Sequence, residues 1–189
     1  MKYASNTFYL VRHAHADFTP GENRPLSKKG KEDAEKVAET LQQFPIKSIY
    51  SSPYKRAYQT IEPFAQQLKL PIQIEPNLRE RKLSGEPVED FFKTVEATWQ
   101  DFSFSHPGGE SNTAAQKRGL NVVNRLQEQN QKRYIVLSTH GNLLALILNG
   151  FDSSINFNFW KSLTMPDIFK LTFSKNDQVE ILRLWQDIG

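Results

Sequence analysis

Short apolar runs alternate with amphipathic segments along most of this chain. Residues 7–11, 47–51, 71–75 and 133–138 are rich in branched and aromatic side chains and end in polar sequence, which is typical of buried strands. Between them, apolar residues recur every three or four positions, as in amphipathic helices. This alternation of strand and helix predicts a parallel sheet with right-handed crossovers.

Three of the predicted helices have residues at their starts that favour capping. Ser27 is expected to cap the first helix. Ser52 and Pro53 are expected to cap and open the second, because proline is favoured in a first helical turn. A later amphipathic helix follows Ser111 and Asn112, and either of these side chains is able to cap it.

The middle and the tail of the chain supply further elements. Residues 88–102 predict a helix within a small helical insertion at about residues 86–106. Residues 167–173 and 179–185 are expected to form two strands joined by a turn at residues 175–177. The expected fold is therefore a three-layer α/β/α sandwich with a mainly parallel central sheet.

Composition fits one folded domain over residues 1–189, with 38% hydrophobic and 12% aromatic residues. The net charge of +3 is spread along the chain, so no nucleic-acid-binding tail is expected. The chain has no cysteine, which excludes disulfides and thiolate metal sites. It also has no apolar signal core and no apolar run of the ~18 residues that span a membrane. We expect a cytoplasmic protein without a membrane partner.

Two predicted strands run directly into a histidine. Arg12 and His13 follow the first strand, and His140 follows the strand at residues 133–138. Ligands of open α/β sheets bind at the carboxyl ends of the strands, so both histidines are expected to face one site. Arg56, in the first turn of the second helix, adds donors for an anion. A neutral imidazole attacks phosphorus readily, and cationic groups stabilise the phosphoryl oxygens.

Transfer of a phosphoryl group from an ester also requires a proton donor for the leaving oxygen. Glu80, in the loop after the third strand, and Glu110, after a Gly-Gly turn, are the candidates on the expected rim. The residues themselves favour neither.

Other side chains near these motifs have competing interpretations. His15 and His13 form a His-x-His pair that, with Asp17, His140 and Asp167, would suit a metal-dependent hydrolase. That site would leave the arginine-rich motifs without a role, so we place His15 on the rim of an anion pocket instead. Among the aromatic residues, most of those at 91–104 are expected in the core and one or two in the pocket. The aromatic residues at 157–160 are expected to cover the sheet edge. Arg79, Arg81 and Lys82 flank Glu80 and are either contacts for an anionic substrate or solvated loop charges, of which the second is the default interpretation.

Six segments resemble, in order, the motifs of the histidine phosphatase superfamily, the phosphoglycerate mutase-like proteins. They are Leu10-Val11-Arg12-His13, Pro25-Leu26-Ser27-Lys28-Lys29-Gly30, Ser51-Ser52-Pro53-Tyr54-Lys55-Arg56-Ala57-Tyr58-Gln59-Thr60, Leu78-Arg79-Glu80, Pro107-Gly108-Gly109-Glu110-Ser111 and Ser138-Thr139-His140-Gly141. The resemblance covers about residues 7–149. It implies that His13 becomes phosphohistidine, that Arg12, Arg56 and His140 bind the phosphate, and that Glu80 donates the proton and then activates water. It implies no metal and no cofactor.

The chain departs from the family pattern at three positions. Ala14 stands where the family often has glycine, and Ser84 stands where a glycine often follows the acid. Thr19 replaces a frequent asparagine, and its hydroxyl is expected to contact the phosphate in its place. Asn142, just beyond the last motif, is a further candidate for the rim.

The sequence thus predicts a metal-independent phosphomonoesterase that acts through phosphohistidine on a small phosphorylated metabolite. Phosphoglycerate mutase-type phosphotransfer is an alternative, although the short middle of the chain favours a phosphatase, because the mutases it resembles are usually longer. A module that binds phosphate esters without turnover is the alternative from another class. Both a monomer and a homodimer fit the sequence.

Overall fold

The computed structural model describes residues 6–19, 21–129, 133–174 and 178–186. Over these residues the chain forms a six-stranded sheet in the order β3-β2-β4-β1-β5-β6. β1 to β4 run parallel, whereas β5 and β6 are antiparallel to their neighbours. The strands are β1 Thr7–Arg12, β2 Ser48–Ser51, β3 Ile72–Ile74, β4 Tyr134–Thr139, β5 Asp167–Phe173 and β6 Val179–Arg183.

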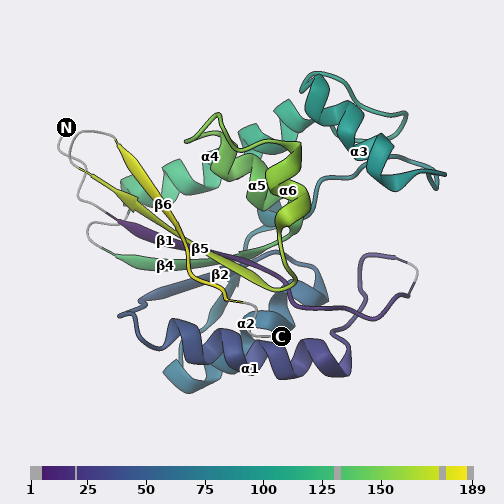
Figure 1. Ribbon diagram of the computed structural model, residues 1–189. Helices are drawn as coiled ribbons and strands as arrows, with labels where there is room; N and C mark the ends of the chain where they lie inside the picture. Colours follow the sequence, from purple (N-terminus) through teal and green to yellow (C-terminus); the bar gives the residue numbers. More distant parts are fainter. Residues whose placement is uncertain (1–5, 20, 130–132, 175–177, 187–189) are drawn as a thin grey trace.

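Helices cover both faces of this sheet, as Figure 1 shows. One face carries α1 (Lys28–Leu41) and α2 (Lys55–Leu68), and the other carries α4 (Asn112–Gln129), α5 (Gly141–Asn149) and α6 (Phe157–Ser162). A short 3-10 helix, η1 (Pro76–Leu78), follows β3, and α3 (Phe91–Gln100) projects beyond the sheet on the side of α4. The predicted three-layer α/β/α fold with a mainly parallel sheet is confirmed.

The central strand β1 is buried on both sides. Phe8 and Leu10 belong to the core between the sheet and the helices α4 and α5, whereas Tyr9 and Val11 belong to the core beneath α1 and α2. Side chains alternate between the faces of a strand, so a strand covered on both faces requires an unbroken apolar run. The unbroken apolar run at residues 8–11 therefore reflects the central position of β1 in the sheet.

The register of the sheet brings three motif residues to one edge. Arg12 of β1 pairs with Thr139 of β4, and the backbone N–H of His13 donates to the Thr139 carbonyl at 3.0 Å. On the other side of β4, the backbone N–H of Ser52 donates to the Ser138 carbonyl at 2.9 Å. His13, His140 and Ser52 thus follow the ends of three adjacent parallel strands.

Several boundaries differ from the sequence prediction. Ser52 does not cap the second helix: α2 begins at Lys55, and Tyr54 at the N-cap position makes no side-chain cap. Its backbone hydrogen bond to Ser138 of β4 holds Ser52 at the sheet edge instead. Ser27 caps α1 as predicted, and the Ser111 hydroxyl accepts a hydrogen bond from the first turn of α4.

The remaining differences concern the middle and the tail. The helix predicted at residues 88–102 is shorter, and α6 was not predicted because its six residues are too few for a periodic pattern. The second tail strand ends at Arg183, and the turn expected at residues 175–177 lies outside the described residues. None of the helices in the described ranges is long and apolar enough to cross a bilayer.

The loop after β1 packs against the start of α1 without space for a side chain. A Cβ on Gly30 would lie 2.0 Å from the His15 carbonyl oxygen, which is also the acceptor for the Ser27 backbone N–H at 3.0 Å. Because both partners are backbone, neither moves without displacing the loop that begins at His13. Gly30 therefore lets α1 approach the strand end closely.

Replacement of this glycine tests the close approach. On helix propensity alone, Gly30→Ala would stabilise the protein by ~1 kcal/mol. We expect it instead to lower the free energy of unfolding by roughly 1–3 kcal/mol, because the new methyl group overpacks a backbone contact. Urea denaturation measures this, with exposed Lys31→Ala as the control on the same helix. A Gly30→Ala protein more stable than the wild type would contradict the contact.

Candidate active site

A cavity of about 350 Å³ opens at the carboxyl ends of the parallel strands. Six residues singled out from the sequence line it: Arg12, His13, His15, Arg56, Glu80 and Asn142. They come from β1 and its loop, from α2, from the loop after η1 and from α5. Residues distant in the sequence therefore meet at one sheet edge.

His13 is held in one orientation and one tautomer. Its Nδ1 lies 2.7 Å from the Ala14 carbonyl oxygen, which only accepts, so Nδ1 carries the proton and Nε2 presents a lone pair. The Nε–H of Arg56 donates to that Nε2 at 3.2 Å. Burial lowers the pKa of His13 to about 3; the Ala14 hydrogen bond opposes this, and the charges of Arg56, Arg12 and Arg24 add to it. His13 is therefore a neutral imidazole near pH 7.

Two arginines are anchored beside this imidazole by backbone carbonyls. Arg12 donates through Nη1 to the carbonyls of Leu163 and Thr164, at 2.9 and 3.1 Å, and its buried Nε has no partner among the described residues. Arg56 donates through Nη1 to the Glu22 carbonyl at 3.0 Å. In each case part of the guanidinium is fixed while other N–H groups are left for an anion in the cavity.

The second histidine, His140, lies next to His13. The two ring centroids are 5.2 Å apart, and His140 is fully buried. Its Nε2 lies 2.7 Å from the hydroxyl of Ser52, whereas its buried Nδ1 has no partner within the described chain. Burial, followed by the charges of His13 and Arg56, holds the pKa of His140 well below its usual range. A bound anion is the natural partner for a proton on Nδ1.

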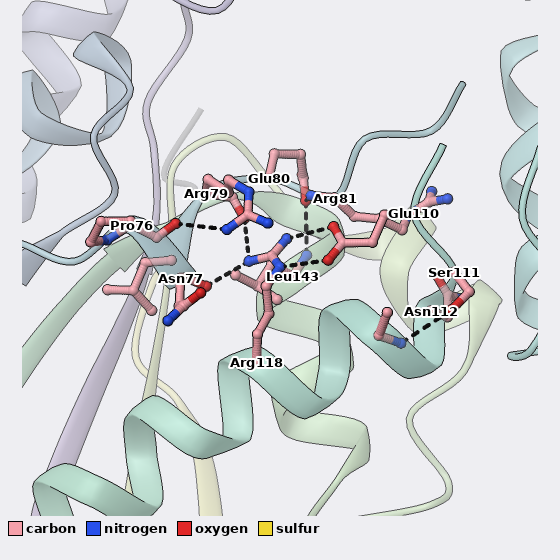
Figure 2. A network of polar contacts seen from close by, with 12 residues as sticks. Pro76, Asn77, Arg79, Glu80, Arg81, Glu110, Ser111, Asn112, Arg118 and Leu143 are labelled. Atoms are coloured by element: carbon pink, nitrogen blue, oxygen red, sulfur yellow. Dashed lines mark hydrogen bonds and ion pairs between the residues drawn. The ribbon is translucent and has the colours of Figure 1, made fainter. Parts of the chain in front are cut away.

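The carboxylate of Glu80 is fixed by the start of α5. Its Oε2 accepts from the backbone N–H of Asn142 and its Oε1 from that of Leu143, both at 3.0 Å. Oε1 also accepts from the backbone N–H of Arg81 at 2.8 Å, in the network drawn in Figure 2. Glu80 lines the same cavity as His13, so it is positioned to exchange a proton with a group bound there.

Glu110, the other candidate acid, is tied to a different partner. Its carboxylate forms a two-point ion pair with Arg118, with Nε–Oε1 and Nη2–Oε2 distances of 2.7 and 2.9 Å. Burial raises the pKa of Glu110, but the hydrogen bonds and charge of Arg118 outweigh it and lower the pKa overall. Figure 2 shows that Arg118 also donates to the carbonyls of Asn77 and Arg79. Glu110 therefore supports the loop that carries Glu80 and does not line the cavity of His13.

The structure does not bring Thr19 into the cavity, contrary to the expectation from the sequence. Its side chain is exposed, because the chain leaves the site after Ala16 and returns at Leu26, where the two residues form a backbone bridge. Arg24, on the returning side, lines the cavity instead. Sequence reasoning missed Arg24, because the length of the intervening loop concealed that it returns to the strand end.

The aromatic residues divide between core and cavity. Phe91 of α3 and Trp160 of α6 line the cavity, with ring centroids 6.1 Å apart. The prediction that Trp160 covers the sheet edge is therefore wrong, since α6 turns it toward α3, whereas Phe159 contacts Phe169 of β5. Trp99 packs against the core, as expected for most of this group.

The rim residues have additional partners. The Asn142 side-chain oxygen accepts from the Trp99 indole N–H at 3.0 Å. His15 is exposed, and its Nδ1 lies 2.8 Å from the hydroxyl of Ser27. Arg81, expected in solvent, is instead buried and lines the cavity. Nothing in the sequence Arg79-Glu80-Arg81 indicates that Arg81 faces inward.

The alternative metal site is not assembled. Among the described residues, no three His, Asp or Glu side chains lie together so as to hold a metal ion. Asp167, proposed for that site, forms an ion pair with Arg183. The cavity instead combines a neutral imidazole, several guanidinium groups and one carboxylate, which suits an anionic substrate and proton transfer.

Comparisons with known proteins agree with this arrangement. A family model described as histidine phosphatase superfamily (branch 1) matches residues 8–185. Phosphoglycerate mutase-like protein 4 of Arabidopsis thaliana is 29% identical over 130 residues, which make up 63% of this chain. The match spans 56% of that protein's own length.

Solved structures share the fold. A mycobacterial glucosyl-3-phosphoglycerate phosphatase superposes with a TM-score of 0.77 at 20% identity, covering 94% of this chain and 97% of that one. A mutant phosphoserine phosphatase from Entamoeba histolytica, in complex with phosphoserine, has a TM-score of 0.76 at 19% identity, covering 95% and 96%. A putative alpha-ribazole-5'-P phosphatase from Escherichia coli has a TM-score of 0.76 at 18% identity, covering 95% and 96%.

The buried neutral state of His13 has a consequence for stability. In the unfolded chain this imidazole takes up a proton near pH 6.5, whereas in the folded protein it stays neutral down to about pH 3. Stability is therefore lost as the pH falls through this window, by about 2 kcal/mol between pH 7 and pH 5. Urea denaturation at both values should show a smaller loss for His13→Asn, whose amide still donates to Ala14. Equal losses in the two proteins would contradict a buried neutral His13.

Proposed function

Because the chain belongs to the histidine phosphatase superfamily, we propose that it is a metal-independent phosphomonoesterase acting through a phosphohistidine at His13. The observation that carries this proposal is the neutral His13, whose Nε2 lone pair faces a cavity lined by arginines and Glu80. The substrate is a small phosphorylated metabolite. Inorganic phosphate and the vanadate VO3 are bound in structures of the mycobacterial phosphatase, which supports an oxyanion site in this fold.

In the first step Nε2 of His13 attacks phosphorus, and the bond from phosphorus to the ester oxygen breaks. The leaving oxygen takes a proton from the carboxyl group of Glu80 and departs as an alcohol. Arg12, Arg56 and His140 donate to the non-bridging oxygens, where negative charge accumulates. As the substrate binds, the Nε–H of Arg56 stops donating to Nε2 of His13 and donates to a phosphate oxygen instead. The lone pair on Nε2 is then free to attack.

In the second step the Glu80 carboxylate takes a proton from water, and the resulting hydroxide attacks the phosphorus of phosphohistidine. The P–N bond breaks, inorganic phosphate leaves, and both His13 and Glu80 return to their starting states. The imidazole is a suitable leaving group because the Ala14 carbonyl keeps its Nδ1 protonated and oriented. With the substrate and one water molecule, both steps balance.

A test of this function is hydrolysis of p-nitrophenyl phosphate in the presence of EDTA. We expect turnover in the wild type and its loss in His13→Ala, because the imidazole that accepts the phosphoryl group is removed. Activity lost to EDTA and restored by zinc would favour a metal-dependent hydrolase. A folded protein that binds phosphate without turnover would favour a binding module, and isomerisation of 3-phosphoglycerate would favour a mutase.

The two glutamates provide a matched pair for the proton donor. With an alkyl phosphate, Glu80→Gln should lower kcat about 10²- to 10⁴-fold, whereas Glu110→Gln should change it by a few-fold at most. With p-nitrophenyl phosphate, whose leaving group needs no proton, the first-step loss in Glu80→Gln should be much smaller. Rapid-quench kinetics with both esters distinguish the steps. Equal losses in both variants would contradict the assignment of Glu80.

A further inference from the structure

Arg81 is a buried cation, and two of its three guanidinium nitrogens have no acceptor among the described residues. Its side chain lines the cavity and the residue is only 5% exposed. Neither Nε nor Nη1 has a hydrogen-bond partner within the described residues, although both are buried. Leaving an arginine in this state is costly, because a buried charge is stable only when it is paired. The guanidinium therefore has donors available for a molecule in the cavity.

The carboxylates nearest to Arg81 are already bound elsewhere. Glu80 accepts from the backbone N–H groups of Asn142 and Leu143, and Glu110 is paired with Arg118. The negative charges of Glu80 and Glu110 stabilise the protonated form of Arg81, but neither carboxylate accepts a hydrogen bond from its guanidinium. Within the described part of the chain, neither carboxylate is thus left to accept from the Arg81 guanidinium, so an acceptor in the cavity would complete this site.

The charges lining the cavity point to the same conclusion. Four guanidinium groups, those of Arg12, Arg24, Arg56 and Arg81, face one carboxylate, that of Glu80. A phosphate monoester brings about −1.5 to −2 charges at neutral pH. The Nε–H of Arg56 donates to His13 at 3.2 Å, and the charges of Arg12 and Arg24 also act on His13, so we place the phosphate on the side of the cavity where these three arginines lie. Arg81 is not among these three arginines, so its positive charge is available for another part of the substrate.

We propose, on the basis of the phosphatase function above, that Arg81 determines specificity by binding a second anionic group on the leaving group of the substrate. The guanidinium fork suits a carboxylate, with which it forms two parallel hydrogen bonds. Phe91, half exposed, and Trp160 line the same cavity and provide an apolar surface for the carbon skeleton between the two anions. The preferred substrate is thus a phosphate monoester of a hydroxy acid.

Arg79 is the matched control, because it lies two residues away in the same loop. Its Nη1 donates to the Pro76 carbonyl at 3.2 Å, and its side chain lines a different hollow, with Glu22 and Lys82. Replacing either arginine by methionine removes one positive charge and keeps most of the apolar stem. Only the change at residue 81 removes a charge from the cavity of His13.

Binding of stable phosphonates tests the proposal independently of turnover. The probes are 4-carboxybenzyl phosphonate and its neutral carboxamide analogue. The 3-substituted isomers are included because they place the carboxylate at a different distance from the phosphonate. By titration calorimetry we expect the better carboxylate isomer to bind the wild type about tenfold or more tightly than its carboxamide. The ratio should fall to near one in Arg81→Met, stay intermediate in Arg81→Lys and persist in Arg79→Met.

Equal binding of each carboxylate and its carboxamide by the wild type would overturn the proposal. An undiminished ratio in Arg81→Met, shown to be folded by circular dichroism, would do the same. Hydrolysis of the matching aryl phosphates separates the two proposals: turnover without carboxylate preference leaves the phosphatase function intact. Carboxylate preference in binding without turnover supports Arg81 and contradicts the phosphatase function. Binding of none of the phosphonates would overturn the role of Arg81.

Discussion

The parallel pairing of β1 with β4 is the constraint from which the site follows. Arg12 and Thr139 are opposite each other in the ladder, so the next residues, His13 and His140, leave the sheet at the same level. A shift of one residue would move the side chains of a strand to the opposite face, which the buried cores on both sides do not allow. Core packing thereby fixes the relative positions of two imidazoles that lie more than a hundred residues apart in the chain.

Burial also determines which form of His13 is present. Desolvation disfavours a protonated imidazole at this position, and the positive charges of the neighbouring arginines also repel it. The Ala14 carbonyl then selects the tautomer with its lone pair on Nε2. The loop is held in this conformation because the Ala14 backbone N–H donates to the Thr60 hydroxyl at 2.9 Å, which in turn donates to the Arg56 carbonyl at 2.7 Å. The nucleophile and its neighbouring arginine are thus positioned by one short chain of hydrogen bonds.

In the proposed arrangement the arginines beside His13 bind the phosphate, Arg81 binds another part of the substrate, and Glu80 lines the same cavity. The carboxylate takes its orientation from the start of α5, and the loop that carries it is supported from outside by the Glu110–Arg118 pair. This arrangement explains why Glu80 lines the cavity whereas Glu110, the other candidate acid, does not. It also explains why Arg118, a residue of α4, supports the site without lining the cavity.

The sequence predicted the sheet and the strand-end histidines because these depend on local patterns. The apolar runs of β1 and β4 and the cap at Ser27 are readable within a few residues. The inward direction of Arg81 and the position of Trp160 depend instead on how α3, α6 and the loop after η1 pack together. Thr19 was expected in the cavity and Arg24 was missed, because the path of a turn-rich loop is set by the residues that anchor its two ends, not by its composition.

The position of the phosphoryl group on the imidazole tests the central claim most directly. The wild-type enzyme, mixed with substrate and denatured in base to preserve phosphohistidine, would be examined by ³¹P and ¹⁵N NMR after labelling with ¹⁵N-histidine. We predict a single adduct on His13 with phosphorus bonded to Nε2. An adduct on Nδ1, an adduct on another residue, or turnover without any phosphohistidine would contradict the account.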